Sequence, residues 1–154
     1  MKQAMIFAAG LGTRLRPLTD HMPKALVQVG GVPLLQLVIE RLKKAGFERI
    51  IVNVHHFSQQ IIDFLHAHDN FGIDILISEE RETLFNTGGG IKYAQKLFTQ
   101  ERILIHNVDI LSNVDLSHFY TRNQEAAATL LVSERNTKRY LLFDETLKLV
   151  GWTN

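Results

Sequence analysis

The sequence predicts an α/β fold built on a mostly parallel sheet, and three observations lead to that class. Short apolar runs alternate with segments whose apolar residues recur at helical spacing, which is the pattern of β-α-β units. A Gly-x-Gly turn follows the first apolar run, which is typical of a buried strand that leads into a ligand-binding loop. The last two strand-like runs are separated by too few residues for a crossover, so they should pair antiparallel.

Five apolar runs predict strands. Each is too short for a buried helix, and several are rich in β-branched residues. In a parallel sheet of this kind the ligand lies at the carboxyl ends of the strands. The predicted strands are the run from Ala4 to just before Gly10, Arg49–Val54, and residues 73–78, 102–106 and 126–133.

Four segments with helical periodicity predict the connections. The first begins at Pro33, a good first helical residue, and stops at Gly46. Ser58 is a suitable cap for the second, which carries apolar residues at helical spacing. The second helix should end within residues 66–70, and the other two are residues 91–98 and residues 114–123, the last capped by Ser112 or Asn113.

The end of the chain predicts an antiparallel hairpin. Its strands are Tyr140–Phe143 and residues 147–152, joined by a turn over residues 144–146. Asp144 is expected in this turn, because an aspartate side chain accepts hydrogen bonds from nearby amides there.

The turn after the first strand combines glycines with cations. Gly10 and Gly12 can reach φ > 0 and let a ligand approach main-chain N–H groups, which predicts a nest for an anion. Arg14, Arg16 and Lys24 add three positive charges in the same stretch. Arginine binds phosphate oxygens bidentately, whereas lysine acts as a movable point charge. The stretch therefore predicts binding of a polyphosphate such as that of a nucleotide.

Two other glycine loops do not fit this stretch. A Walker A loop needs Gly-Lys followed by Ser or Thr, which this sequence lacks. A dinucleotide fingerprint needs glycine where Leu15 stands, and it needs an acid at the end of the second strand, where His55 and His56 stand.

Two later features also follow predicted strands. Thr87 precedes three glycines, residues 88–90, which favour either close contact with a planar or phosphate-bearing ligand or a flexible hinge. Asp109 follows the fourth strand directly. Taken alone it predicts either a ligand for a hard divalent cation or a cap for the next turn.

The first stretch resembles the signature of sugar nucleotidyltransferases, which join a sugar 1-phosphate to a nucleoside monophosphate. The signature is Gly-x-Gly-Thr-Arg-Leu-x-Pro-Leu-Thr followed by Pro-Lys. This many fixed positions in one span make the match specific. The matching residues are Gly10, Gly12, Thr13, Arg14, Leu15, Pro17, Leu18, Thr19, Pro23 and Lys24.

The resemblance implies a fold, a reaction and a set of roles. The fold would be the Rossmann-like three-layer α/β/α sandwich of nucleotide-diphospho-sugar transferases, and the substrates a nucleoside triphosphate and a sugar 1-phosphate, with Mg²⁺. Arg14 would clamp the leaving phosphates, Lys24 would bridge the α-phosphate and the incoming oxygen, and Asp109 would anchor the metal. The remaining implied nucleotide contacts are Ala8, Ala9, Gly10, Gly12 and Thr13 in the first loop, and Thr87, Gly88 and Gly89 beside base and ribose. Glu80 is either an acceptor at the base edge or one more solvated acid in the charged stretch over residues 79–82, and the second reading is favoured by its neighbours.

The string from Leu84 to Ile91 is most similar to the branch that uridylylates N-acetylmuramate 1-phosphate, with mannose 1-phosphate guanylyltransferases nearby. Uridylyl and guanylyl transfer are thus favoured over other bases. Most members have glycine where Val108 stands, and a side chain at this position could crowd the ligand, so the chain departs from the family pattern here. Family members continue past the hairpin into a sugar-binding part with a second metal-binding aspartate. We therefore expect residues 1–154 to be the nucleotide-binding part of a single truncated domain.

Composition limits the other classes of function. The formal charge is +1, with 17 basic and 16 acidic residues, which argues against nucleic acid as a partner. The sequence has no cysteine and no run of 18 apolar residues, so we expect a cytoplasmic protein without a membrane partner. A homo-oligomer is compatible with these features. Two alternatives stay open: a catalytically silent nucleotide-binding or NDP-sugar-binding regulatory domain, and, less favoured, a Rossmann oxidoreductase.

Overall fold

The computed structural model describes residues 1–122 and 126–153. The chain divides into two compact units, Met1–Arg122 and Asn123–Asn154. The prediction that both belong to one domain stays a prediction. None of the helices within the described ranges is long and apolar enough to cross a membrane.

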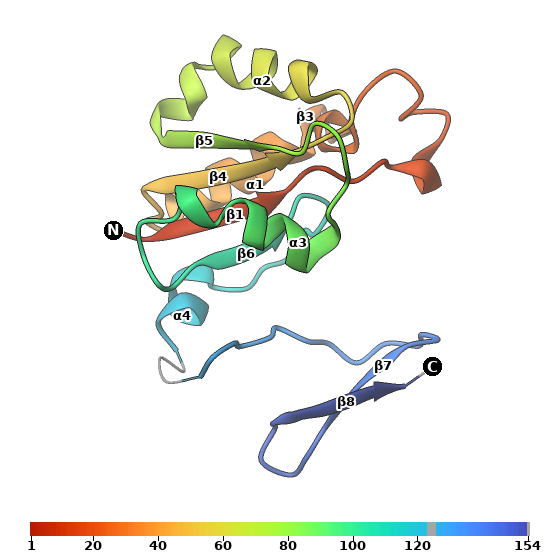
Figure 1. The fold of residues 1–154 in the computed structure, drawn as a ribbon, viewed down its shortest axis with the longest axis vertical. Helices are drawn as coiled ribbons and strands as arrows, with labels where there is room; N and C mark the ends of the chain where they lie inside the picture. The colour runs from red at the N-terminus through yellow and green to blue at the C-terminus, as the bar shows by residue number, and fades with distance from the viewer. Residues whose placement is uncertain (123–125, 154) are drawn as a thin grey trace. The chain divides into compact units, whose positions relative to one another are not determined.

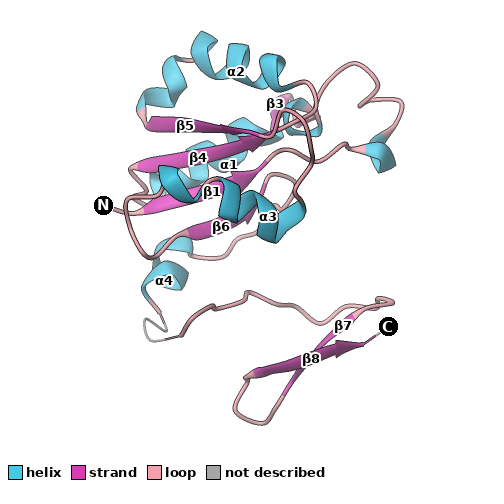
Figure 2. Cartoon of the chain, viewed as in Figure 1, coloured by secondary structure: helices cyan, strands magenta, loops and turns pink. Residues whose placement is uncertain are grey.

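The first unit is built on a four-stranded parallel sheet, drawn in Figures 1 and 2. Its strands lie in the order β5-β4-β1-β6. Phe7 at the end of β1 is in register with Asn53 of β4 on one side and with Asn107 of β6 on the other. The carboxyl ends of these strands therefore meet at one edge, as predicted. The strands are β1 Gln3–Phe7, β4 Arg49–Val54, β5 Asp74–Glu79 and β6 Leu104–Asn107.

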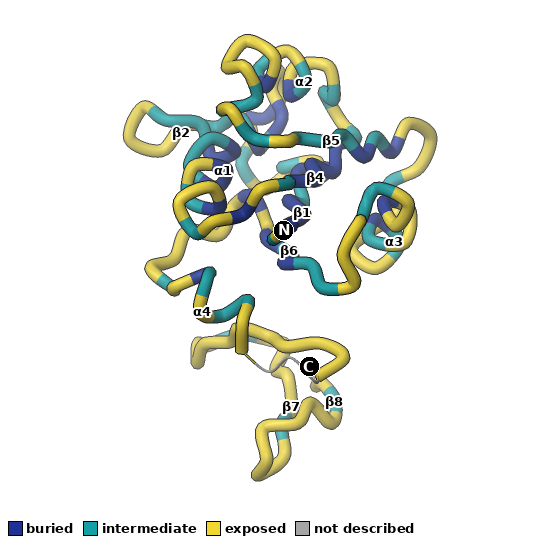
Figure 3. Tube along the Cα trace, turned by 90° about the vertical axis from the view of Figure 1, so that its left-hand side faces the viewer, coloured by how far each residue is buried: buried dark blue, intermediate teal, exposed yellow. Residues whose placement is uncertain are grey.

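Helices cover both faces of this sheet, which gives the predicted three layers. The larger core cluster packs one face against α1 (Leu34–Lys44) and α2 (Ser58–Ala67). The smaller cluster, around Met5 and Ile51, packs the other face against α3 (Asn86–Tyr93). Figure 3 shows α1 and α3 on opposite sides of the buried strands.

The first two predicted helices are confirmed, with corrections at their starts. Helix α1 begins at Leu34, one residue after Pro33, because Pro33 belongs to the short strand β3. Gly46 has φ 80° and follows the end of α1, as predicted. Ser58 does not cap α2: it is the first helical residue, and its hydroxyl donates to Glu79 Oε1 instead.

A small hairpin that we did not predict precedes α1. Strand β2 (Gln28–Val29) pairs antiparallel with β3 (Val32–Pro33) through Gly30 and Gly31. Both glycines have positive φ, 59° and 82°, which a two-residue hairpin turn of matching twist requires. Short 3₁₀ turns complete this unit: η1 Thr13–Leu15, η2 Lys24–Leu26, η3 Asp69–Gly72 and η4 Gln95–Leu97.

The glycines at residues 88–90 lie inside α3 rather than opening it. We expected a helix over residues 91–98, but α3 spans Asn86–Tyr93 and η4 follows. Close packing requires glycine at two of these positions, because a Cβ on Gly89 would lie 2.8 Å from Phe85 Cβ and one on Gly90 would lie 2.9 Å from Glu80 Oε1. Glycine lets the helix approach its neighbours here at the cost of helix propensity.

The helix predicted over residues 114–123 is shorter and has another cap. Helix α4 spans Leu116–Thr121, and residue 123 lies outside the described residues. The cap is Asp115, not Ser112 or Asn113: its Oδ1 accepts from the His118 amide at 2.9 Å. An aspartate in this position bonds an amide that the first helical turn leaves unpaired.

The second unit contains the predicted hairpin but not the predicted fifth strand. Strand β7 (Tyr140–Phe143) pairs antiparallel with β8 (Leu149–Thr153). Asp144 Oδ1 accepts from the amides of Thr146 and Lys148, both at 2.9 Å, which confirms its place in the turn. The prediction of a strand over residues 126–133 is wrong, because these residues pair with no other described segment. An apolar run becomes a strand only when a neighbour satisfies its backbone groups.

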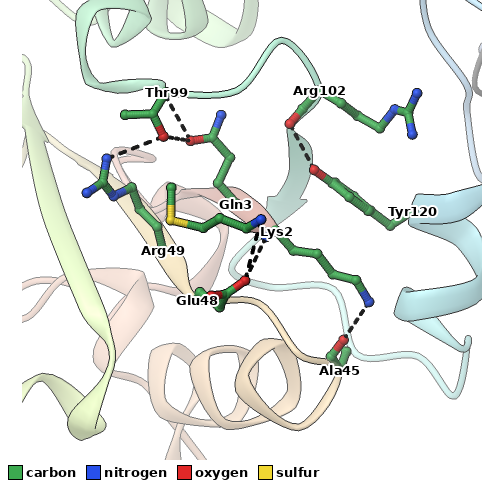
Figure 4. A network of polar contacts seen from close by, with 9 residues as sticks. Lys2, Gln3, Ala45, Glu48, Arg49, Thr99, Arg102 and Tyr120 are labelled. Atoms are coloured by element: carbon green, nitrogen blue, oxygen red, sulfur yellow. Dashed lines mark hydrogen bonds and ion pairs between the residues drawn. The ribbon is translucent and has the colours of Figure 1, made fainter.

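Polar contacts join the connecting segments at the amino-terminal edge of the sheet (Figure 4). The buried Gln3 accepts from the amide of Thr99 at 3.1 Å, and Arg49 donates to the Thr99 hydroxyl at 3.5 Å. Lys2 Nζ donates to the carbonyl of Ala45 at 3.2 Å. These contacts hold the segment before β6 and the loop before β4 at the edge opposite the strands' carboxyl ends.

Candidate nucleotide site

The candidate site lies where β1, β4 and β6 end. The loop after β1 leaves the sheet at this edge, away from the N-terminus (Figure 1). The amide of Val108 donates to the carbonyl of Phe7 at 3.2 Å, and the amide of Ala8 donates to the carbonyl of Asn53 at 3.0 Å. Ala8 and Ala9 are buried, so they form the floor from which the loop departs. Their predicted place beside a base stays a prediction.

Thr19 fixes the glycine turn in the first loop. Gly12 has φ 66°, the left-handed region that glycine adopts without strain. The Thr19 hydroxyl, which is buried, donates to the carbonyl of Gly12 at 2.8 Å. A Cβ on Gly12 would lie 2.8 Å from Thr19 Cγ2 and 3.2 Å from Lys24 Cβ. Positive φ and close packing therefore both require glycine at position 12.

The loop leaves backbone donors available to a ligand. Within residues 1–122 and 126–153, no backbone or side-chain group of the protein accepts from the amides of residues 10–12. Gly10 differs from Gly12, because its φ is not positive and an added Cβ would meet nothing within 4 Å. Gly10 thus leaves open space over unpaired amides, an arrangement that suits an anion.

Cations flank these amides. Arg14 lies on η1 and is exposed, as is Thr13, and Arg16 forms an ion pair with Asp20 at 3.4 Å. Lys24, at the start of η2, contacts Asp109 Oδ2 with its ammonium group. This ion pair joins the first loop to the residues just after β6. Two of the three predicted catalytic residues are therefore in direct contact.

The carboxylate of Asp109 suits a shared metal ion rather than a preformed metal site. Its side chain is 36% exposed, and no group of three or more His, Asp or Glu side chains gathers as a metal site in the described ranges. Magnesium is commonly held by one or two carboxylates, with substrate phosphates and water completing its shell. One reachable carboxylate beside open amides fits that mode of binding.

The glycine segment contributes an exposed helix start. Thr87 and Gly88 are exposed in the first turn of α3, and Gly89 is half-buried. A Cβ on Gly88 would meet nothing within 4 Å outside its own helix, so this position, like Gly10, leaves space for a ligand.

Glu80 is buried and has partners within the protein. It is 1% exposed, its Oε1 accepts from Asn53 Nδ2 at 2.7 Å, and its Oε2 accepts from the amide of Phe85 at 2.9 Å. It is thus no solvated surface acid, although its sequence neighbours are charged. Its predicted contact with a base stays a prediction.

Val108 does not crowd the site. Its side chain is 3% exposed and belongs to the larger core cluster. A valine in place of the usual glycine therefore fills the core and does not project toward the proposed ligand.

Two buried side chains at the site, Thr19 and Asn53, were not predicted as functional residues. Thr19 was inside the signature, and its burial was not visible in the sequence. Asn53 had a usable signal: it is the polar residue in the otherwise apolar stretch Ile50–Val54 of β4, Ile-Ile-Val-Asn-Val. A buried amide in a strand needs a partner, and here the partner is Glu80.

Comparison with known proteins finds relatives for most of the chain. The nucleotidyl transferase family matches residues 3–140. N-acetylmuramate alpha-1-phosphate uridylyltransferase of Caulobacter vibrioides is 44% identical over 110 residues, covering 70% of this chain and 46% of the relative. The enzyme of the same name from Neisseria meningitidis is 41% identical over 115 residues, covering 75% and 50%.

A solved structure shows the same fold. The structure of HddC from Yersinia pseudotuberculosis complexed with GMP-PN has a TM-score of 0.80 and 23% identity, covering 100% of this chain and 69% of that one. The chain spans about half the length of the two uridylyltransferases it matches. On the family match, which covers most of its residues, this chain belongs to the nucleotidyl transferase family.

Proposed function

We propose that this chain carries the nucleotide-binding half of an enzyme that transfers a nucleoside monophosphate from a nucleoside triphosphate to a sugar 1-phosphate. The observation that carries the proposal is the junction of the Gly10–Gly12 turn, with its unpaired amides, and the Lys24–Asp109 ion pair at one sheet edge. In the reaction, a phosphate oxygen of the sugar 1-phosphate attacks the α-phosphorus. The bond from the α-phosphorus to the bridging oxygen breaks, and pyrophosphate leaves.

The proposed roles follow from charge and position. The amides of residues 10–12 and the exposed Arg14 would bind the β- and γ-phosphates, where negative charge increases as pyrophosphate leaves. Lys24 would turn from Asp109 to the α-phosphate and the incoming oxygen, because its ammonium is a movable point charge. The sugar phosphate is already ionised near neutral pH, so no general base is needed.

Magnesium is the proposed cofactor. Asp109 would hold it, and the ion would offset negative charge on the phosphates that it shares with the protein. Release of Asp109 from Lys24 would free both side chains for their partners at the same time.

The proposed base is uracil, with guanine as the second candidate. Two relatives that are more than 40% identical over at least 110 residues are named as uridylyltransferases, and a D-glycero-alpha-D-manno-heptose 1-phosphate guanylyltransferase is 31% identical over 138 residues. The sugar-binding part, a homo-oligomeric state and a cytoplasmic location remain predictions from sequence.

Calorimetric titration of the 154-residue chain with UTP, GTP, CTP, dTTP and ATP in the presence of Mg²⁺ tests the proposal. We expect UTP or GTP to bind most tightly, and Arg14→Ala to weaken triphosphate binding by about tenfold, as for loss of a charged hydrogen bond. The same variant should change binding of the corresponding monophosphate far less. Arg122→Ala, which removes an arginine just after α4, is the control. If none of the five nucleotides binds, the proposal is contradicted.

A further inference from the structure

We infer that the buried Asn53–Glu80 pair positions the glycine-rich start of α3 for nucleotide binding, and that Glu80 acts through the protein rather than on the base. The inference rests on the proposed function. It replaces a direct contact between Glu80 and the base with contacts that the structure contains.

Both the backbone and the side chain of Glu80 form contacts within the protein. Its amide donates to the carbonyl of Val54 at 2.9 Å, and its carbonyl is in contact with Nδ1 of His55. Its side chain accepts from Asn53 and from the amide of Phe85, as described above. Glu80 therefore links the end of β4 to the residue just before α3, and it closes the loop over residues 81–85.

The same carboxylate sets how closely α3 approaches the sheet. A Cβ on Gly90 would lie 2.9 Å from Glu80 Oε1, 3.3 Å from Phe7 Cε1 and 3.6 Å from Asn53 Nδ2. Gly90 is itself buried, so the helix backbone rests directly on these three side chains. Moving the carboxylate would shift the turn that carries Thr87 and Gly88.

A base could reach the Glu80 carboxylate only if the segments that cover it moved apart, because Glu80 is 1% exposed. Both carboxylate oxygens already accept hydrogen bonds from buried or half-buried donors. An Asn53 amide and a Phe85 N–H left without partners are costly in a buried setting. A positioning role keeps all of these bonds while nucleotide is bound.

Four variants of the 154-residue chain test the inference. Glu80→Ala and Asn53→Ala remove either side of the pair. In Glu80→Gln, the glutamine oxygen can accept from Phe85 and its NH₂ can donate to a flipped Asn53 amide, so the links can re-form. Glu79→Gln is the matched control, because Glu79 is the adjacent acid and bonds Ser58 and Arg81 instead.

Dissociation constants for UTP and GTP with Mg²⁺ are measured well below the melting temperature of every variant. We expect Glu80→Ala and Asn53→Ala to weaken both nucleotides by about tenfold, with the UTP-to-GTP ratio unchanged. Glu80→Gln should stay within about twofold of the wild type for both. A role confined to global stability would lower the melting temperature without moving these constants.

Three outcomes would overturn the inference. In the first, Glu80→Ala binds both nucleotides as tightly as the wild type. In the second, Glu80→Gln changes the ratio of the UTP and GTP dissociation constants, which would favour a direct contact between Glu80 and the base. The amides of Phe85 and the first turn of α3 could also retain their hydrogen-exchange rates in Glu80→Ala, which would show that the pair does not hold the segment. If the wild-type chain binds neither nucleotide, the proposed function fails first and the inference fails with it.

Discussion

At the scale of single residues, the glycines of this site differ in what they accommodate. Gly12 and Gly90 are required by the protein itself, because an added Cβ would meet Thr19 or Glu80 at under 3 Å. Gly10 and Gly88 face open space. A glycine that packing does not require, next to unpaired amides or a helix start, is the arrangement expected where a ligand approaches the backbone.

Gly88→Ala tests whether position 88 needs glycine for folding or for ligand binding. Alanine is favoured over glycine within a helix by about 0.8–1 kcal/mol, so α3 and the free energy of unfolding should be maintained or raised. Nucleotide binding should weaken, because the new methyl group occupies the proposed contact surface. Urea unfolding and calorimetric titration measure the two effects. Lys92→Ala, an exposed change in the same helix, should leave binding unchanged, and equal binding by both variants would contradict the proposed contact.

At the scale of elements, the first loop is ordered by a side chain that lies outside the glycines. Thr19 reaches back seven residues to the carbonyl of Gly12. The loop between them carries Arg14, so its cation is presented from a closed turn and not from a free chain. A turn that is already closed loses less conformational entropy when it binds phosphate.

Thr19→Val tests this closure. Valine keeps the methyl group next to Gly12 but removes the hydroxyl donor, so we expect a loss of about 1 kcal/mol in the free energy of unfolding. Triphosphate binding should weaken as well, because the loop then loses conformational entropy when it binds. Thr121→Val, which removes a hydroxyl from α4, should leave binding intact. A Thr19→Val protein with wild-type affinity would show that the loop is ordered by other contacts.

At the scale of the whole molecule, one buried histidine couples stability to pH. His106 lies on β6 and is 8% exposed. Burial lowers the pKa of its imidazole, an effect that the charge of Arg41 adds to, while the bond to the Asn107 carbonyl acts in the opposite direction. The folded chain therefore binds a proton at this site less readily than the unfolded chain does.

The lowered pKa of His106 makes the folded chain less stable at acidic pH. Above the unfolded pKa of about 6.5 both states are neutral at this site, and His106 adds no pH dependence. Below this pKa the unfolded state takes up the proton first, so the free energy of unfolding falls as pH decreases. For one proton the slope is at most about 1.4 kcal/mol per pH unit, and it ends where the lowered pKa of the folded state is reached. Unfolding by urea between about pH 7.5 and 5 should show this slope in the wild type, weakened in His106→Gln. His66→Gln, at an exposed position, should retain it.

Much of the fold and part of the site could be predicted from the sequence. The four parallel strands, the first two helices and the hairpin follow from local pattern, because hydrophobic periodicity and short connections depend only on neighbouring residues. The loop after β1 was predictable for the same reason, since its glycines and cations are adjacent in the chain. Failures came where a distant partner decides the outcome. Residues 126–133 have the composition of a strand but no described partner. The start of α3 at Asn86 was missed as well, and its Gly90 packs against Glu80, just after the end of β5.

The sequence by itself determined the fold class, the parallel direction of the first strands and the position of the glycine-and-cation loop after β1, because these depend on spacing and on residue type. Only the tertiary structure decided that Lys24 contacts Asp109 across 85 residues, that Val108 faces the core, and that Glu80 is buried against Asn53. The physical reason is that burial and pairing belong to the space between elements. A charged residue in an acidic stretch looks solvated in the sequence until the fold places a donor beside each of its oxygens.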